Sequence, residues 1–378
     1  MISVRFLQRD RLPALFDRLR EHGYRCIGPL VRDGAIVYDD LPDATALPVA
    51  IGVDQAPGRY RLKQEDHGRC FAWANGPQAL KPMLFASRET LWRVARGNDG
   101  GLGFEPVLQP PERRAVIGVR ACDLAALALQ DAHFMQRIVD RGYQGRRRNL
   151  FLIGIDCAHP ADTCFCVSTG DGPAVTAGAD LALTELDTGF LVRSGSDAGA
   201  ALCDELPLRA ATDEERRLAD VEIDHARRSQ RRRLPGRNLR DALFANLDHP
   251  RWAEVAGRCL SCGNCVAVCP TCFCSTEREE AALDGTGAEH LRIWDTCFSA
   301  EHSYLHGRLL RPDTKHRYRQ WLTHKLGGWH DQFGRSGCVG CGRCIAWCPT
   351  GIDITAEATA ICADETNLVP EALPEDNP

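Results

Sequence analysis

The sequence predicts an α+β protein: an N-terminal α/β domain with short parallel strands, joined to a cysteine-rich C-terminal domain. Apolar runs at 115–119 and 150–155 each end abruptly, and a helical pattern follows the first. Strand, turn and helix in succession are typical of parallel α/β packing. Further along, the segments 259–270 and 338–349 each hold four closely spaced cysteines. We therefore expect the fold of the C-terminal part to depend on its cysteines and not on the packing of apolar side chains alone.

We expect four parts along the chain. They are an N-terminal α/β domain at 1–212, a charged helical linker at 213–250, a cysteine-rich domain at 251–362 with a helical insertion at 275–337, and an acidic tail at 363–378. Charges of alternating sign in the linker are typical of a solvated helix. The tail is acidic and contains proline, so we expect it to be mobile.

The composition indicates a soluble globular protein. Of the 378 residues, 44% are hydrophobic and 26% are charged, and the formal net charge is −5. No apolar run approaches the roughly 18 residues of a membrane-spanning helix. The N-terminus also lacks the basic-then-apolar pattern of a secretion signal, so we expect a cytoplasmic protein without membrane contact. The 19 cysteines of such a chain point to metal rather than to disulfides.

The first forty residues predict a helix followed by a hairpin. Apolar residues recur at helical spacing within 1–25, namely Leu12, Leu15, Phe16 and Leu19. We expect this helix to dock on a core, because Pro13 and mixed charges argue against a membrane anchor. The segment 27–38 predicts a hairpin with Asp33 and Gly34 at its turn. Beyond it, 40–82 is rich in proline, glycine and aspartate, which indicates loop-rich β structure.

Two cysteines follow the apolar runs of the predicted parallel sheet. Cys122 comes just after 115–119, and Cys157 comes just after 150–155. In parallel sheets, ligands bind beyond the carboxyl ends of the strands. Cys164 and Cys166 follow Cys157 closely, so four soft ligands could converge on a third cluster. A further hairpin is expected at 181–193.

The two cysteine-rich segments share the spacing C-x2-C-x2-C-x3-C-P. This spacing is that of bacterial ferredoxins, whose loops bind [4Fe–4S] cubes, so we expect a ferredoxin-like domain with two clusters. Three thiolates on one tight loop cap three irons, while the fourth cysteine points away and serves the other cube. Gly263 and Gly342 allow the backbone to approach the sulfurs. The predicted ligand sets are Cys259, Cys262, Cys265 and Cys348 for one cube, and Cys338, Cys341, Cys344 and Cys269 for the other.

Other assignments of the cysteines remain open. Structural zinc also uses C-x2-C pairs, but two full quartets that each end in Cys-Pro favour iron–sulfur clusters. For the extra cube, the rival ligands are Cys272, Cys274 and Cys297. Four cysteines belong to none of these sets, and we expect them to be buried and to pack as small apolar side chains. They are Cys26, Cys70, Cys203 and Cys362.

Basic residues gather in two places. Between the cysteine-rich segments, 301–330 is basic and carries five interleaved histidines and several aromatic residues. It predicts either a docking face for an anion or a partner, or a helix whose aromatic residues pack on the cluster domain. Arg231, Arg232 and Arg233 form a short basic run without a nucleic-acid-binding motif around it, so we expect no nucleic-acid partner.

Several long motifs resemble one family. They are RCLSCGNCVAVCPTCFCSTE, WDTCFSAEHSYLHG and YRQWLTHKLGGWHDQFGRSGCVGCGRCIAWCPTGIDIT, with GRYRL at 58–62, IGVRACDLAAL at 117–127, and IGIDCAHPADTCFC with STGDGP at 153–173. The chain resembles the beta iron–sulfur subunits of cytoplasmic [NiFe] hydrogenases of the sulfhydrogenase type, and the related iron–sulfur subunit of anaerobic sulfite reductase. The resemblance extends from about residue 25 to residue 356.

The resemblance implies a non-catalytic electron-relay subunit. Its expected partners are a flavin subunit that exchanges hydride with NAD(P)H, and either the small and large [NiFe] hydrogenase subunits or a sulfite reductase catalytic subunit. No dinucleotide fingerprint contradicts this, since GLGFEP at 101–106 lacks a third glycine and a preceding strand. The alternatives are a stand-alone reductase of sulfur compounds and a redox-sensing iron–sulfur protein.

Overall fold

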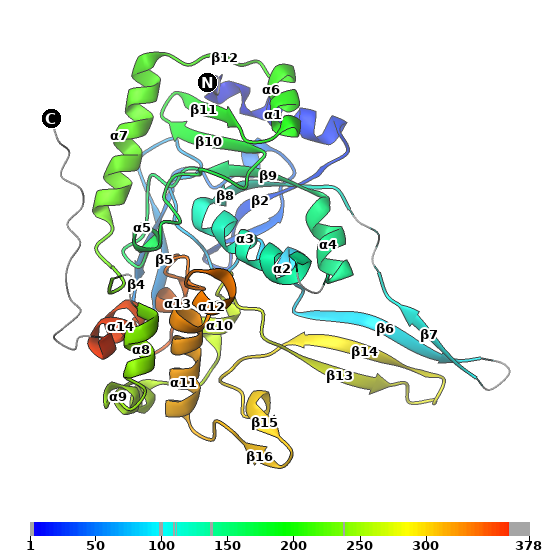
Figure 1. The fold of residues 1–378 in the computed structure, drawn as a ribbon. Helices are drawn as coiled ribbons and strands as arrows, with labels where there is room; N and C mark the ends of the chain where they lie inside the picture. The colour runs from blue at the N-terminus through cyan, green and yellow to red at the C-terminus, as the bar shows by residue number, and fades with distance from the viewer. Residues whose placement is uncertain are drawn as a thin grey trace.

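The computed structural model describes residues 4–97, 101–108, 110, 112–136, 139–236 and 239–362. The predicted acidic tail at 363–378 lies outside these residues. Helices and strands are mixed, and a large sheet lies beside a smaller, cysteine-rich part (Figure 1). No helix in the described part of the chain is both long and apolar enough to span a bilayer.

The large sheet has eight strands in the order β12-β1-β11-β10-β9-β8-β2-β3. Its central strands β2, β8, β9 and β10 are parallel, as the sequence predicted, and the flanking strands are antiparallel. The bounds are Arg209–Ala210 (β12), Arg5–Gln8 (β1), Gly189–Ser194 (β11), Leu181–Leu186 (β10), Leu150–Ile155 (β9), Arg114–Arg120 (β8), Arg25–Arg32 (β2) and Ala35–Asp40 (β3).

Both predicted hairpins of this sheet are confirmed. β2 and β3 are joined by Asp33 and Gly34, whose φ angles of 50° and 73° are those of a tight two-residue turn. β10 and β11 form the second hairpin, with Leu186 paired to Gly189. Both strands are buried along most of their length, because the sheet is covered by helices on both faces (Figure 1).

The N-terminal segment differs from the predicted single helix. Residues Arg5–Gln8 form the strand β1, and the helix α1 begins only at Leu12 and ends at Glu21. Pro13 does not interrupt the helix, because it lies in the first turn, where a missing amide proton costs nothing. The predicted apolar face is buried as expected, through Leu12, Leu15, Phe16 and Leu19.

Two helices connect the parallel strands β8 and β9. Helix α3 (Ala121–Gln136) begins directly at the end of β8, and α4 (Arg141–Arg148) leads into β9. The remaining helices of this part are α2 (Lys81–Leu84), α5 (Cys166–Thr169), α6 (Asp197–Glu205) and α7 (Asp213–Ser229). Helix α7 is the predicted charged helix, yet it buries Ala219, Ile223 and Ala226, so it is solvated on one side only.

A second sheet joins distant parts of the chain. Its order is β13-β14-β6-β7, with bounds Ser275–Ala281, Gly287–Trp294, Arg88–Arg96 and Leu102–Pro106. Its strands project away from the rest of the molecule (Figure 1). The predicted helical insertion at 275–337 is therefore wrong in its first part, which forms the hairpin β13–β14. The four consecutive charged residues of β13 give no strand alternation, and pairing of β14 with β6 sets the strand conformation.

The cysteine-rich part is built from short helices around an aromatic core. Trp252, Tyr318, Trp321 and Leu326 are among its buried residues. The helices are α8 (Leu239–Ala245), α9 (Arg251–Arg258), α10 (Asn264–Ala267), α11 (Thr314–Thr323), α12 (His330–Phe333), α13 (Arg343–Ala346) and α14 (Ile354–Cys362), with a π turn at His324–Gly328. Two small hairpins complete the fold, β4 (Ile51–Ala56) with β5 (Arg59–Gln64), and β15 (Tyr304–Leu305) with β16 (Arg308–Leu309).

The basic segment 301–330 packs on this core. Tyr318, Trp321 and Trp329 are all buried there. Arg317 donates hydrogen bonds to the carbonyls of Phe298, Arg311 and Pro312. The structure therefore favours the second interpretation of this segment, in which its aromatic residues stabilise the cluster domain.

Candidate iron–sulfur centres

The two cysteine-rich segments, called here the first cysteine motif (259–270) and the second cysteine motif (338–349), have the same backbone geometry. Gly263 and Gly342 have φ angles of 75° and 73°, and each lies directly before a one-turn helix, α10 or α13. This left-handed conformation is costly for residues with a Cβ. The amide of Ser261 donates to Cys259 Sγ, and that of Gly340 donates to Cys338 Sγ, both at 3.4 Å.

The structure brings the eight motif cysteines together around two neighbouring cavities. The first is lined by Cys259, Cys262, Cys265 and Cys348, and the second by Cys269, Cys338 and Cys341; Cys344 lines both. The first cavity thus receives Cys344 and Cys348 from the second motif, and the second cavity receives Cys269 from the first motif. The predicted crossing of Cys269 and Cys348 is compatible with this lining. Because Cys344 lies between the cavities, the two sites are adjacent.

The groups around the cavities suit sulfur-rich clusters. Thr271 Oγ1 lies 3.2 Å from Cys269 Sγ, and Thr350 Oγ1 lies 3.5 Å from Cys348 Sγ, at equivalent positions after the two Cys-Pro pairs. Among the described residues, Tyr318 Oη and Trp321 Nε1 are buried without a hydrogen-bond partner, and both residues line the first cavity. Buried donors of this kind need an acceptor, which the sulfides of a cluster would supply.

Burial sets the protonation state of the metal-free thiols in both cavities. Burial and neighbouring cysteines raise the pKa of Cys338 to about 12, and burial also raises the pKa of Cys265 and Cys344. Without metal, these groups would therefore be protonated near neutral pH. Iron binds thiolates, so it must displace those protons, and its binding is expected to tighten as pH rises.

The two cavities differ in their access to solvent. Cys262 is exposed, and the neighbouring Leu260 keeps 66% of its surface exposed. In contrast, Cys341 in the second cavity is 9% exposed. The first cavity therefore reaches the protein surface, whereas the second is covered by the N-terminal half of the chain.

The four cysteines predicted as a third ligand set, the N-terminal cysteine set, also come together. Cys122 opens helix α3 at the end of β8, Cys157 follows β9, and Cys164 and Cys166 lie at the start of α5. Cys122 and Cys166 pack in one buried cluster with Cys341 of the second cysteine motif. Cys157, Cys164 and Cys166 are close enough to raise one another's pKa, after the larger effect of burial.

Side-chain amides donate to the sulfurs of this set. Asn75 Nδ2 lies 3.2 Å from Cys122 Sγ, and Gln230 Nε2 lies 3.3 Å from Cys166 Sγ. No pattern in the sequence pointed to either donor, because Asn75 and Gln230 are distant in the chain from the cysteines that they contact. Hydrogen bonds to ligand sulfurs are one means of tuning a cluster.

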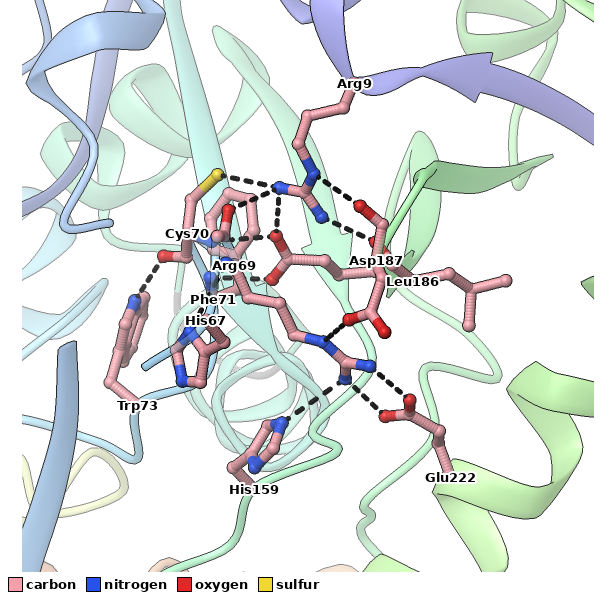
Figure 2. A network of polar contacts seen from close by, with 12 residues as sticks. Arg9, His67, Arg69, Cys70, Phe71, Trp73, His159, Leu186, Asp187 and Glu222 are labelled. Atoms are coloured by element: carbon pink, nitrogen blue, oxygen red, sulfur yellow. Dashed lines mark hydrogen bonds and ion pairs between the residues drawn. The ribbon is translucent and has the colours of Figure 1, made fainter. Parts of the chain in front are cut away.

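A polar network holds residues 67–73, the segment that leads to Asn75 (Figure 2). Arg69 bonds Glu222 and Asp187, and Glu185 accepts bonds from the amides of Cys70 and Phe71 at 2.8 and 2.7 Å. Arg120, at the end of β8, then donates to the carbonyls of Phe71 and Trp73 at 2.8 and 2.6 Å. The loop is thus fixed between the sheet and the N-terminal cysteine set.

The second cysteine motif packs directly against the backbone of the N-terminal cysteine set. A Cβ on Gly340 would lie 2.5 Å from the amide nitrogen of Cys166, and one on Gly342 would lie 2.4 Å from the carbonyl of Thr163. The amide of Phe165 donates to the carbonyl of Gly340 at 2.8 Å. Only glycine permits this approach.

Seven cysteines remain outside these sets. Cys26 and Cys203 are buried in the core of the large sheet with Cys70, and Cys362 is buried on α14. These four have apolar surroundings, as expected, although Cys70 also takes part in the network of Figure 2. The rival ligands Cys272, Cys274 and Cys297 lie together at the base of the hairpin β13–β14.

Comparisons with known proteins agree with this geometry. Residues 258–352 match the model of a 4Fe-4S dicluster domain. The chain is 33% identical over 354 residues to sulfhydrogenase 2 subunit beta of Pyrococcus furiosus, covering 92% of this chain and 95% of that protein. The chain belongs to the sulfhydrogenase beta-subunit family. No solved structure matches it.

Membership in the sulfhydrogenase beta-subunit family confirms the predicted resemblance and the iron–sulfur character of the chain. The matched dicluster region contains both cysteine motifs together with Cys272, Cys274 and Cys297. The N-terminal cysteine set lies outside it. The structure nevertheless places that set against Cys341, so the two halves of the chain meet at cysteine side chains.

Proposed function

We propose that this chain is the electron-relay subunit of a cytoplasmic oxidoreductase complex. The observation that carries the proposal is the pair of adjacent cysteine-lined cavities, one open to the surface at Cys262 and one buried against the N-terminal half. Clusters in such sites, when bound, carry single electrons. The residues hold them in a fixed order, shield one from water and leave the other accessible to a partner.

The ligand assignment in this proposal follows the crossing of the two motifs. One cube is held by Cys259, Cys262, Cys265 and Cys348, and the other by Cys338, Cys341, Cys344 and Cys269. A third cube is held by Cys122, Cys157, Cys164 and Cys166. Support for the third comes from the contact of Cys122 and Cys166 with Cys341, and from the amide donors Asn75 and Gln230.

The arrangement gives the relay a direction across the protein. The N-terminal cysteine set contacts Cys341 of the second cavity. Cys344 lines both the second cavity and the first, and Cys262 of the first cavity is exposed at the protein surface. Leu260 and Asn264 are exposed beside Cys262, so a partner that docks there would cover an apolar side chain near the outermost cluster.

The partners in this proposal are a flavin subunit that oxidises NAD(P)H and the small and large [NiFe] hydrogenase subunits. The relative from Pyrococcus furiosus is named a sulfhydrogenase subunit, which favours hydrogenase over sulfite reductase as the catalytic partner. The alternatives, a stand-alone reductase of sulfur compounds and a redox sensor, would need no such partners.

Anaerobic kinetics with the purified chain would test the proposal. The isolated chain should accept electrons from dithionite but should not oxidise NAD(P)H, evolve hydrogen or reduce polysulfide by itself. Addition of the flavin and hydrogenase subunits of its complex should restore NAD(P)H-dependent hydrogen evolution. Turnover of polysulfide by the isolated chain would instead support the stand-alone reductase.

A further inference from the structure

Three cysteines outside the sites above gather at the base of the hairpin β13–β14; we call Cys272, Cys274 and Cys297 the hairpin cysteine set. Ser275 pairs with Trp294 at the start of the hairpin, and the amide of Asp295 donates to the carbonyl of Cys274 at 3.0 Å. The hairpin thus brings Cys297 back beside Cys274. Cys272 and Cys297 are buried.

A histidine is oriented toward the same place. His302 lies in the short 3-10 helix Glu301–Ser303, and its Nδ1 is 2.9 Å from Asp295 Oδ2. The thiol of Cys274 lies close enough to His302 to raise the pKa of the imidazole. A histidine whose Nδ1–H is held by a carboxylate presents Nε2 as a ligand, which is the usual support of metal-binding histidines.

Two buried lysines lie near the hairpin cysteine set without a carboxylate, and one of them, Lys325, also lines the second cavity. Lys325 and Lys81 are 3% and 5% exposed, and in the described part of the chain neither forms an ion pair. Lys325 Nζ donates to Thr271 Oγ1 at 2.7 Å, and Lys81 Nζ donates to the carbonyls of Val266 and Ala267, both at 3.2 Å. Burying an ammonium group is expensive unless a negative charge accompanies it. The lysines therefore require an anionic occupant nearby.

We propose that Cys272, Cys274, Cys297 and His302 hold an additional iron–sulfur cluster, separate from the dicluster pair and from the N-terminal cysteine set. Soft thiolates select iron–sulfur clusters or zinc. Among the described residues, no three metal-binding side chains gather tightly enough to hold a single ion. A negatively charged cluster would also supply the counter-charge that Lys81 lacks, whereas Lys325 lies between this site and the second cavity.

The location makes this site part of the relay rather than a remote structural centre. Cys272 lies beside Cys269 of the second cavity, and Cys297 lies near Cys265 of the first. A histidine ligand raises the reduction potential of a cluster relative to cysteine alone. The proposed cluster therefore lies beside both dicluster sites and differs from them in potential.

Metal analysis of the anaerobically purified full chain tests the proposal. Cys297→Ser and Cys272→Ser should each lose about four irons and four sulfides per chain, as expected for one cube. The electron paramagnetic resonance (EPR) signals of the dicluster pair should remain. Cys203→Ser is the matched control, because Cys203 is equally buried but lies in the core of the large sheet, and it should keep its full iron content. Unchanged iron in both hairpin variants, or one zinc per chain in the parent, would overturn the site.

A second variant tests the ligand set even if the serine variants fold poorly. His302→Cys should keep the full iron content, lose a nitrogen hyperfine coupling in pulsed EPR, and lower the midpoint potential of one cluster. A parent protein without that coupling would exclude His302 as a ligand. Absence of the dicluster EPR signals from the parent protein would refute the proposed relay function. Failure of that function can thus be distinguished from failure of the hairpin site.

Discussion

Arg343 and Asp123 form a bidentate ion pair in the interior of the protein, with N–O distances of 2.7 and 2.8 Å. Their side chains are 2% and 1% exposed. Arg343 belongs to the second cysteine motif, and Asp123 directly follows Cys122. The pair therefore fastens the dicluster domain to the N-terminal cysteine set, and Arg343 also donates to the carbonyl of Gly76 at 2.9 Å.

Removing one partner of this pair should destabilise the protein strongly. Asp123→Asn leaves a buried guanidinium without its counter-charge, which costs about 3–5 kcal/mol in the free energy of unfolding. Thermal melting under anaerobic conditions would measure the loss. Asp204→Asn serves as the control, since the pair of Asp204 with Arg5 is largely exposed and its loss should have little effect. A small shift for Asp123→Asn would contradict the fastening role.

Cross-ligation predicts an unusual pattern of damage. Cys269→Ser should impair the cube held by Cys338, Cys341 and Cys344, and leave the cube held by the other cysteines of its own motif in place. The reason is that Cys269 lines the second cavity, not the first. EPR of the reduced variant would show which of the two signals is altered. Damage confined to the first cube would refute the crossed assignment.

Loss of the N-terminal cysteine set should lower the iron content without disturbing the dicluster pair. Cys122→Ala and Cys157→Ala should each reduce iron by about four atoms per chain, from the full complement of the parent. Cys26→Ala is a suitable control, because Cys26 is buried in the core of the large sheet. If the iron content of both variants equals that of the parent, the four cysteines do not bind a cube.

Iron retention should depend on pH. The pKa of Cys338 is raised to about 12 and that of Cys166 to about 12, both first by burial, so below that pH the metal-free thiols are protonated. Protons therefore compete with iron throughout the range from pH 6 to about 9, and binding tightens as pH rises. Chelator-induced iron loss, followed by absorbance, should be faster at the acid end. Equal rates across this range would show that thiol protonation does not limit release.

Close backbone contact should make Gly340 intolerant of a side chain. Gly340→Ala places a methyl group 2.5 Å from the backbone of Cys166, so the second motif must move away from the N-terminal cysteine set. Gly334→Ala is the matched control: Gly334 also has a positive φ of 70°, but nothing lies within 4 Å of a Cβ there. We expect reduced iron content and melting temperature for Gly340→Ala, and only a small backbone-strain effect for Gly334→Ala. Similar behaviour of the two variants would count against the contact.

The sequence predicted those features of the fold and site that depend on the spacing of neighbouring residues. The two motifs, the hairpin turn at Asp33 and Gly34, and the position of Cys122 after a strand all depend on residues that are close in the chain. It could not predict partners supplied from a distance, such as Asn75 on Cys122 or Arg343 on Asp123. It also missed the hairpin β13–β14, because that segment is set by pairing with β6 rather than by its own pattern.

The pairing of β14 with β6 has a consequence for how the protein is made. Arg88 of β6 bonds Glu280, a residue 192 positions later, so the second sheet cannot close until most of the chain has left the ribosome. The hairpin that closes it is flanked by the first cysteine motif and by Cys297. The first cysteine motif and Cys297 therefore belong to the same late-synthesised segment that completes this sheet, and β6 keeps an open edge until that segment has been made.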